Sequence, residues 1–431
     1  MKYFPLSKLG IASLAIALSF APHRSRAGGE GFNQDISDNK ETIDTKSDLG
    51  LGKFAAFPFH VSVTVRNGYD DNVNLSSFDE RESFFTNGAV NFTYDFGNAR
   101  TRLSLNTGVS ATYYWDNGNN QFNNNSDSFD VNAYFGFSIV HRATPRLTLS
   151  AQVNAAYLSR PGFDTFNNNF FVVERRSQNF FQTIDKFSVG YAWTPRFSTV
   201  TSYTLGYINY DDVVISQFED RFEHTFGNEF RFLIQPTTTL VAEYRFGIVD
   251  YIENGLRNST SNFFLGGVDH SFSPRFNLSV RAGVEVREFD HAAAFGASDN
   301  NTSPYAEATV NYALAKNTSI SFFNRYSQEQ PNVPDALSRE TYRTSLSLRH
   351  AFTARISAGL NFAYQHDAYD QTLAQNAFNE DSFDIQLSAR YAINRNFAID
   401  VGYQHTEVTS DANLFREFTR NQIYGGVTFT W

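Results

Sequence analysis

The last residues of the chain alternate strictly between apolar and polar side chains. Ile423, Gly425, Val427, Phe429 and Trp431 occupy one set of alternate positions, and the intervening set is mostly polar. Because successive side chains of a β-strand point to opposite faces, this segment is predicted to be a strand with one apolar and one polar face. The same alternation recurs along most of the chain from about residue 57. The sequence therefore predicts an all-β protein.

Two kinds of connection separate the predicted strands. Short turns such as 143–146, 193–196 and 273–275 place Pro next to Arg, and Pro favours turns because it fixes φ and donates no ladder hydrogen bond. The other connections are long and rich in Asn and Asp: 116–127, 160–178, 288–303, 328–340 and 366–381. Short periplasmic turns and long extracellular loops are typical of outer-membrane barrels. We count about 18 strands (16 to 18) and predict a transmembrane antiparallel up-and-down β-barrel.

The N-terminus carries the features of an export signal. Lys2 and Lys8 accompany an apolar stretch over residues 9–20, and Ser25-Arg26-Ala27 fits a small-x-small cleavage site. We predict a signal peptide over 1–27, a flexible periplasmic segment over 28–52 and the barrel over 53–431. Export by the general secretory route to the outer membrane of a Gram-negative-type cell follows from these features.

Composition narrows the class further. Beyond the leader, no apolar stretch reaches the roughly 20 residues of a transmembrane helix, whereas 45 Phe and 22 Tyr suit strand faces and aromatic girdles. The chain has no Cys, which excludes a disulfide scaffold. Its net charge of −10 argues against nucleic-acid binding. A soluble propeller or solenoid is the structural rival, but the chain lacks the repeat motifs of either.

If the apolar set faces lipid, the polar set faces the interior. Charge on the lipid face would cost about 2–4 kcal/mol near the midplane, and barrels of 16 to 18 strands enclose an aqueous channel. The lumen and selectivity candidates are Glu229, Arg231, Glu243, Arg245, Arg281, Glu285, Arg287, Arg343, Arg349, Asp384 and Arg390. The sequence therefore predicts a water-filled lumen with a mixed-charge lining.

These interior charges allow two interpretations. Glu229 and Arg231 lie on the strand before the turn at Pro236, and Glu243 and Arg245 lie on the strand after it, so opposite charges can pair across the ladder. Alternatively, an unpaired excess sets ion or sugar preference, as charged rings do in pores. The candidate basic wall for transport consists of Arg281, Arg287, Arg343, Arg349 and Arg390.

Two loop segments are further candidates. The loop 160–178 has an apolar centre, Phe170, Phe171, Val172 and Val173, which would narrow the barrel if it folds inward; a strand tip or a subunit contact are the alternatives. Asp70 and Asp71 form a weak calcium candidate, but the Gly and Glu of an EF-hand loop are missing, so a solvated acidic turn is favoured. No catalytic motif is present, and we expect no enzyme activity, cofactor or metal site.

The segment from Pro58 to Val73, which ends in Tyr-Asp-Asp-Asn-Val, resembles the opening of the putative β-barrel porin 2 family. The repeated Thr-Pro-Arg turns are similar too, and the resemblance covers roughly residues 55–431. It implies a bacterial outer-membrane barrel, and some members of the family are associated with exopolysaccharide clusters. It supplies no catalytic residues.

The expected function is passive passage of small hydrophilic solutes or ions. One alternative is a conduit for exopolysaccharide export, for which Tyr305, Phe323 and Tyr424 are the candidate lumen aromatics. Another is a closed structural or adhesion barrel that acts through its loops. Ile423, Val427, Phe429 and Trp431 resemble the signal recognised by the barrel-assembly machinery. The expected partners are this machinery, outer-membrane lipid and lipopolysaccharide, and small solutes or polysaccharide; the oligomeric state stays open.

Overall fold

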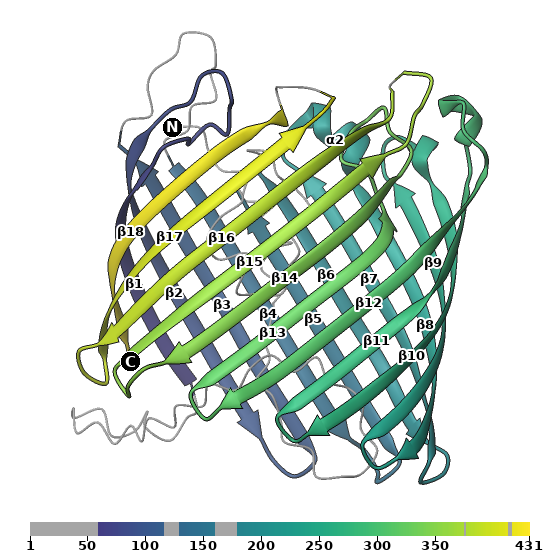
Figure 1. Cartoon of the computed structure of the whole chain (residues 1–431), viewed down its shortest axis with the longest axis horizontal. Coiled ribbons are helices and arrows are strands. Elements are labelled where there is room, and N and C mark those ends of the chain that lie inside the picture. The colour runs from purple at the N-terminus through teal and green to yellow at the C-terminus, as the bar shows by residue number, and fades with distance from the viewer. Residues whose placement is uncertain (1–58, 116–128, 160–178, 375, 413–415) are drawn as a thin grey trace.

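The computed structural model describes residues 59–115, 129–159, 179–374, 376–412 and 416–431 (Figure 1). Eighteen antiparallel strands form one sheet. The strands are β1 (Phe59–Asp70), β2 (Ser83–Gly97), β3 (Thr101–Tyr114), β4 (Phe129–Arg142), β5 (Leu147–Leu158), β6 (Phe180–Ala192), β7 (Phe197–Tyr210), β8 (Arg221–Gln235), β9 (Thr238–Tyr251), β10 (Ser259–Ser273), β11 (Phe276–Phe289), β12 (Asn300–Ala315), β13 (Thr318–Glu329), β14 (Arg339–Ala351), β15 (Ile356–Tyr369), β16 (Phe378–Ala392), β17 (Phe397–Ser410) and β18 (Phe418–Thr430). Short helices lie in the loops: α2 (Val213–Glu219), η2 (Gly255–Arg257) and η3 (Ala292–Phe295).

The sheet closes on itself between the first and the last strand. Each strand pairs with its sequence neighbours, and β1 also pairs with β18 from Ser62↔Thr430 to Asp70↔Gln422. The Trp431 amide donates to the Val61 carbonyl at 2.8 Å, and the Val61 amide donates back at 3.0 Å. The predicted up-and-down barrel and its strand count are therefore confirmed.

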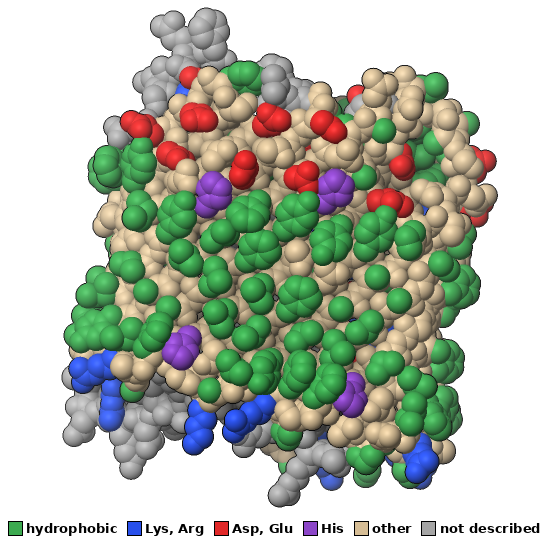
Figure 2. Space-filling model, in the orientation of Figure 1, with side chains coloured by type: hydrophobic (Ala, Val, Ile, Leu, Met, Phe, Trp, Pro, Cys, Tyr) green, Lys and Arg blue, Asp and Glu red, His purple; other side chains and the backbone are tan. Residues whose placement is uncertain are grey.

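Strand alternation separates an outer from an inner surface. In β1, Val63 and Val65 are 42% and 49% exposed, whereas Thr64 between them is 4% exposed. Ile423, Val427, Phe429 and Trp431 also lie among the exposed apolar side chains. Figure 2 shows such side chains as a band around the visible face. An outer apolar band over a polar interior is the arrangement that lets a barrel reside in a bilayer.

The two ends of the barrel differ in their connections. Hairpin turns of a few residues join β2 to β3, β4 to β5 and so on, and both β1 and β18 reach this turn end (Figure 1). Several turns share one device: the Thr144 hydroxyl accepts the Arg146 and Leu147 amides at 3.2 and 3.0 Å, and Thr194 and Thr353 do the same in their turns. Side-chain oxygens that accept backbone N–H groups are the reason Thr and Asn favour such turns.

Some sequence-based predictions fall on other parts of the chain. The signal peptide 1–27, the periplasmic segment 28–52 and the apolar loop centre from Phe170 to Val173 lie outside the described residues. The first described strand begins at Phe59, within the barrel range of 53–431.

Candidate channel lining

The inner surface differs between two parts of the barrel. Hydroxyl and amide groups dominate the inward positions of β2 to β7, where Tyr134 donates to the Asn91 side chain at 2.6 Å and Ser150 and Ser188 share a 2.6 Å hydrogen bond. Most inward-facing charged side chains belong to β8 to β18. The lining thus consists of a largely neutral wall and a charged wall.

A series of alternating charges crosses the charged wall from β8 to β11. Arg231 donates to Glu229 at 2.6 Å and also pairs with Asp269. Arg281 lies 2.8 Å from Asp269 and 3.8 Å from Glu243. Each carboxylate in this series therefore faces at least one guanidinium, which offsets the desolvation that burial imposes on a charge.

The series continues into β12 through a tyrosine. The Arg245 guanidinium donates to Glu243 at 2.6 Å and to the Tyr305 hydroxyl at 3.1 Å, and that hydroxyl donates to Glu307 at 2.8 Å. These interior charges are therefore paired, as the first interpretation predicted, but the pairs do not form across the β8–β9 ladder. Glu229 lies directly opposite Glu243 across the β8–β9 hairpin, so the pairs form along each strand and toward β10 and β11.

A second cluster lies at the loop end of β13 and β14. Glu329 forms ion pairs with Arg325, with Arg343 at 3.0 Å and with Arg339 at 3.8 Å. Arg339, which is fully buried, also lies 2.9 Å from Asp367. Three guanidiniums and two carboxylates leave this cluster with an excess of positive charge.

The remaining predicted lining residues also lie on inward positions. Glu285 pairs with Arg287 at 2.8 Å and accepts the Ser261 hydroxyl, and Asp384 accepts the Thr406 hydroxyl at 2.7 Å. Of the predicted basic wall, Arg281, Arg287 and Arg343 therefore have carboxylate partners. Arg349 is half-buried, and Arg390 is exposed. Their role in selectivity stays a prediction.

The exposed inward-facing charges are mostly basic. Arg102, Arg142, Lys186 and Arg390 are exposed on inward strand positions, and Asp95 is the exposed acid found on the same surface of β2. The sequence analysis missed Arg102, Arg142 and Lys186. Alternation alone identifies them, because Arg102 precedes outward Leu103 and Lys186 precedes outward Phe187.

The connection between β13 and β14 folds over the loop-end mouth. Ala336 and Leu337 are buried, against Tyr369 and Phe378 in one case and against Phe289 and Ala292 in the other. The Val333 carbonyl accepts the Arg257 guanidinium at 3.3 Å, and the Asn332 side chain accepts Arg416 at 3.2 Å. Because Arg257 precedes β10 and Arg416 precedes β18, these contacts tie the loop 330–338 to distant parts of the rim.

The candidate lumen aromatics are largely covered by cations. The Arg245 guanidinium lies 5.3 Å from the ring centroid of Tyr305, and that of Arg66 lies 5.0 Å from Tyr424. Both tyrosines are buried, and Phe323 is half-buried. A cation over an aromatic face stabilises both groups and occupies the surface on which a sugar would stack.

The acidic pair after the first strand is part of the barrel seam. Asp70 is fully buried and accepts the Arg420 guanidinium at 2.5 Å and the Gln422 amide at 2.7 Å. Asp71 accepts the backbone and side-chain N–H groups of Asn421 at 2.6 and 2.7 Å. The expectation of a solvated acidic turn was wrong for Asp70, because β18 supplies its partners. Within the described residues, no cluster of three or more potential metal ligands occurs.

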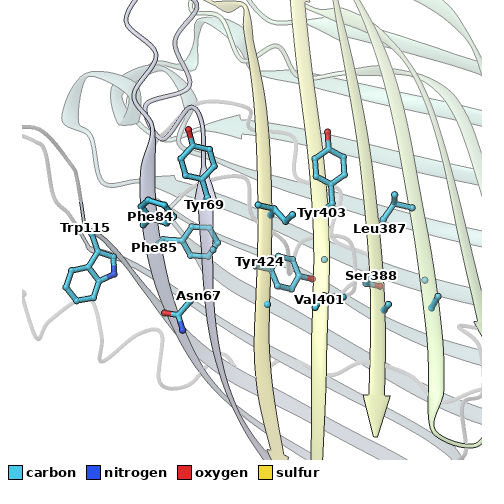
Figure 3. A pocket seen from close by; sticks show the side chains of 17 residues that line it. Asn67, Tyr69, Phe84, Phe85, Trp115, Leu387, Ser388, Val401, Tyr403 and Tyr424 are labelled. Carbon is cyan, nitrogen blue, oxygen red and sulfur yellow. The ribbon is translucent and has the colours of Figure 1, made fainter.

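A groove of about 950 Å³ lies on the outer wall rather than in the lumen (Figure 3). Its floor contains small outward-facing residues such as Ala358, Ala389 and Gly425, and Trp115 and Tyr403 contribute to its walls. The groove therefore faces the hydrocarbon phase and does not belong to the channel lining.

A closed strand barrel with an apolar outer band and a polar interior defines the class of this protein. It has the architecture of a transmembrane β-barrel of the outer-membrane type. Residues 257–430 match the model of the family described as "Putative beta-barrel porin 2", which is the family that the sequence resembles. No helix in the described part of the chain is long and apolar enough to cross a membrane.

Several solved structures are similar to this chain at low sequence identity. OpdK from Pseudomonas aeruginosa is 11% identical, with 86% of this chain and 99% of that chain covered and a TM-score of 0.42. OccK9 (OpdG) from the same organism is 9% identical, with 86% and 98% covered and a TM-score of 0.44. A BenF-like porin from Pseudomonas fluorescens is 9% identical, with 86% and 99% covered and a TM-score of 0.44. No curated protein matches the sequence.

Proposed function

We propose that this barrel is a passive channel for small hydrophilic solutes and ions, with a preference for anions. The polar interior of an 18-stranded barrel supports a water-filled path. The observation that carries the anion preference is the set of exposed inward bases, Arg102, Arg142, Lys186 and Arg390. The buried charges of β8 to β12 largely pair with one another, and the cluster on β13 and β14 adds a positive excess, so basic groups dominate the field that a passing ion meets.

Single-channel recording in a planar bilayer under a salt gradient tests this proposal. We expect discrete current steps and a reversal potential whose sign indicates anion preference. Lys186→Gln and Arg390→Gln should each move the reversal potential toward the cation side. Arg395→Gln is the matched control, because Arg395 is exposed on a hairpin turn instead of the inner wall. Absence of current from a correctly folded barrel would contradict the channel, and equal shifts in all three variants would contradict the assignment of selectivity.

A further inference from the structure

The hairpin turns carry a ring of basic residues. All but the turn at Pro236 contain an exposed Lys or Arg, and none of the described turns contains an acid. This basic rim consists of Arg100, Arg146, Arg196, Arg275, Lys316, Arg355 and Arg395. Figure 2 shows the contrast: Lys and Arg side chains lie below the apolar band, and Asp and Glu side chains lie above it, toward the loop end.

Exposed apolar side chains adjoin the basic rim. Trp193 precedes Arg196 in its turn and is 56% exposed, Phe352 precedes Arg355 and is 62% exposed, and Phe272 lies just before Arg275. A soluble anionic partner would bind the basic rim but would make no favourable contact with these exposed apolar side chains. A phospholipid uses both components, because its acyl chains contact the apolar band while its phosphate meets the adjacent cation.

The same hydrogen-bonded pair occurs three times on the outer wall at this end. Nδ1 of His141, His270 and His350 lies 2.8 Å from the hydroxyl of Thr101, Thr238 and Thr318, respectively. In each case the two residues are register partners on neighbouring strands. Within the described residues, the Nε2 atoms of these rings have no hydrogen-bond partner. Each ring is thus oriented by a neutral hydroxyl and keeps one nitrogen for a ligand.

Two of these pairs lie between turns that supply cations. The Ala351 amide, next to His350, donates to the Asn317 carbonyl in the turn that contains Lys316, and the Asn317 side chain donates to the Ala351 carbonyl. Arg355 belongs to the following turn. For His141, the Arg142 amide donates to the Arg100 carbonyl at 2.7 Å, and the next turn carries Arg146. An imidazole N–H flanked by two cationic side chains matches the oxygens of a phosphate diester.

His366, at the loop end, has a carboxylate as its partner instead of a neutral hydroxyl. Nδ1 of His366 lies 2.8 Å from the Asp381 carboxylate, which also accepts the Tyr364 hydroxyl at 2.6 Å. A carboxylate beside the ring repels a phosphate, so this histidine cannot serve an anionic headgroup in the same way. His366 therefore differs from the three turn-end histidines in the charge of its partner and not in residue type.

We propose that the turn-end rim binds anionic phospholipid headgroups, with the three Thr–His pairs and the basic rim as the recognition elements. The Thr–His pairs face sideways on the outer wall, where the membrane reaches them, rather than along the barrel axis, where a soluble polymer would approach. This inference is independent of what passes through the lumen.

Native mass spectrometry of the full, detergent-purified barrel with equal phosphatidylglycerol and phosphatidylcholine tests the proposal directly. We expect preferential retention of phosphatidylglycerol, and loss of one rim cation should weaken binding about fivefold, the equivalent of ~1 kcal/mol per basic side chain at an anionic surface. Equal retention of both lipids would overturn the proposal. So would tight binding of a soluble polyanion such as polyglutamate without any lipid preference, which would make the rim a surface for a soluble partner.

Variants assign the effect to the named residues. The triple variant His141→Phe, His270→Phe and His350→Phe keeps three rings but removes the nitrogens, and we expect reduced phosphatidylglycerol retention. His366→Phe is the matched control and should retain lipid as the unmodified chain does. A second variant, Arg275→Gln with Arg355→Gln, changes only exposed turn residues. It therefore tests the proposal even if the triple variant fails to fold. Unchanged retention in both variants would overturn the assignment.

Discussion

Arg420 and Asp70 show how much a single ion pair can matter in this barrel. Arg420 is 4% exposed and Asp70 is fully buried, and they join residues that lie 350 positions apart in the sequence. Arg420 also lies near the Tyr114 hydroxyl, at 3.4 Å. A buried pair adds little net stability compared with apolar residues, but removal of one member leaves the other as an unpaired buried charge.

We therefore predict that Arg420→Met lowers the free energy of unfolding by about 3–5 kcal/mol, because Asp70 loses its cation. Urea titration of the refolded barrel measures the change. Arg81→Met is the matched control: Arg81 pairs with Asp79 at 3.0 Å, but that carboxylate is 70% exposed. Surface pairs of this kind contribute about 0–1 kcal/mol. Equal effects of the two substitutions would refute the importance of burial.

At the scale of the strand, β6 places opposite requirements on adjacent residues. Lys186 faces the lumen near the middle of the strand, and Phe187 faces outward with 45% exposure. The side-chain period of two means that exchange of these neighbours puts each one in the wrong environment. Composition, length and net charge stay the same, so any change in stability is caused only by which side chain faces the lumen and which faces the lipid.

The double substitution Lys186→Phe with Phe187→Lys should cost about 2–4 kcal/mol, the price of a lysine at the lipid midplane. Unfolding in urea and the shift in gel mobility on heating both report the loss. Lys186→Gln alone should leave stability nearly unchanged, because the lumen position accepts a neutral polar group. If the exchanged variant were as stable as the starting chain, the assignment of inner and outer faces in β6 would be wrong.

The strands, the turns and the facing of side chains are predictable because each depends on residues that are close together in the sequence. The alternation around Phe276 and Leu278 and the Thr-Pro-Arg turns predicted strands, turns and facing correctly. The partners of the interior charges were not predictable. Arg231 pairs with Asp269, two strands further along, and this contact depends on rotamers and strand tilt that periodicity does not encode. The inward fold of residues 330–338 likewise depends on packing among loops.

At the scale of the whole molecule, the mouth is shaped by a loop that holds several parts of the rim together. Residues 330–338 contact Arg257 before β10 and Arg416 before β18. This loop was recognised in the sequence only as a long connection, while a different segment was the predicted constriction. The described contacts make 330–338 the structural candidate for a restriction of conductance.

Replacement of residues 333–337 by a Gly-Ser linker of equal length should increase single-channel conductance, because Ala336 and Leu337 no longer anchor the loop across the mouth. Planar bilayer recording measures the change. Replacement of the exposed tip 77–80 by the same kind of linker is the control and should leave conductance unaltered, since Phe78 is 60% exposed. Unchanged conductance in the first variant would show that the loop does not limit flow.

The seam between β1 and β18 also makes closure of the barrel depend on both ends of the sheet. The edge of β1 and the buried Asp70 carboxylate both have their partners on the last strand, which is thirteen residues long. Without β18 the sheet has two open edges, each able to pair with another copy. A chain cut short before Phe418 would therefore remain an open sheet prone to association with its own kind.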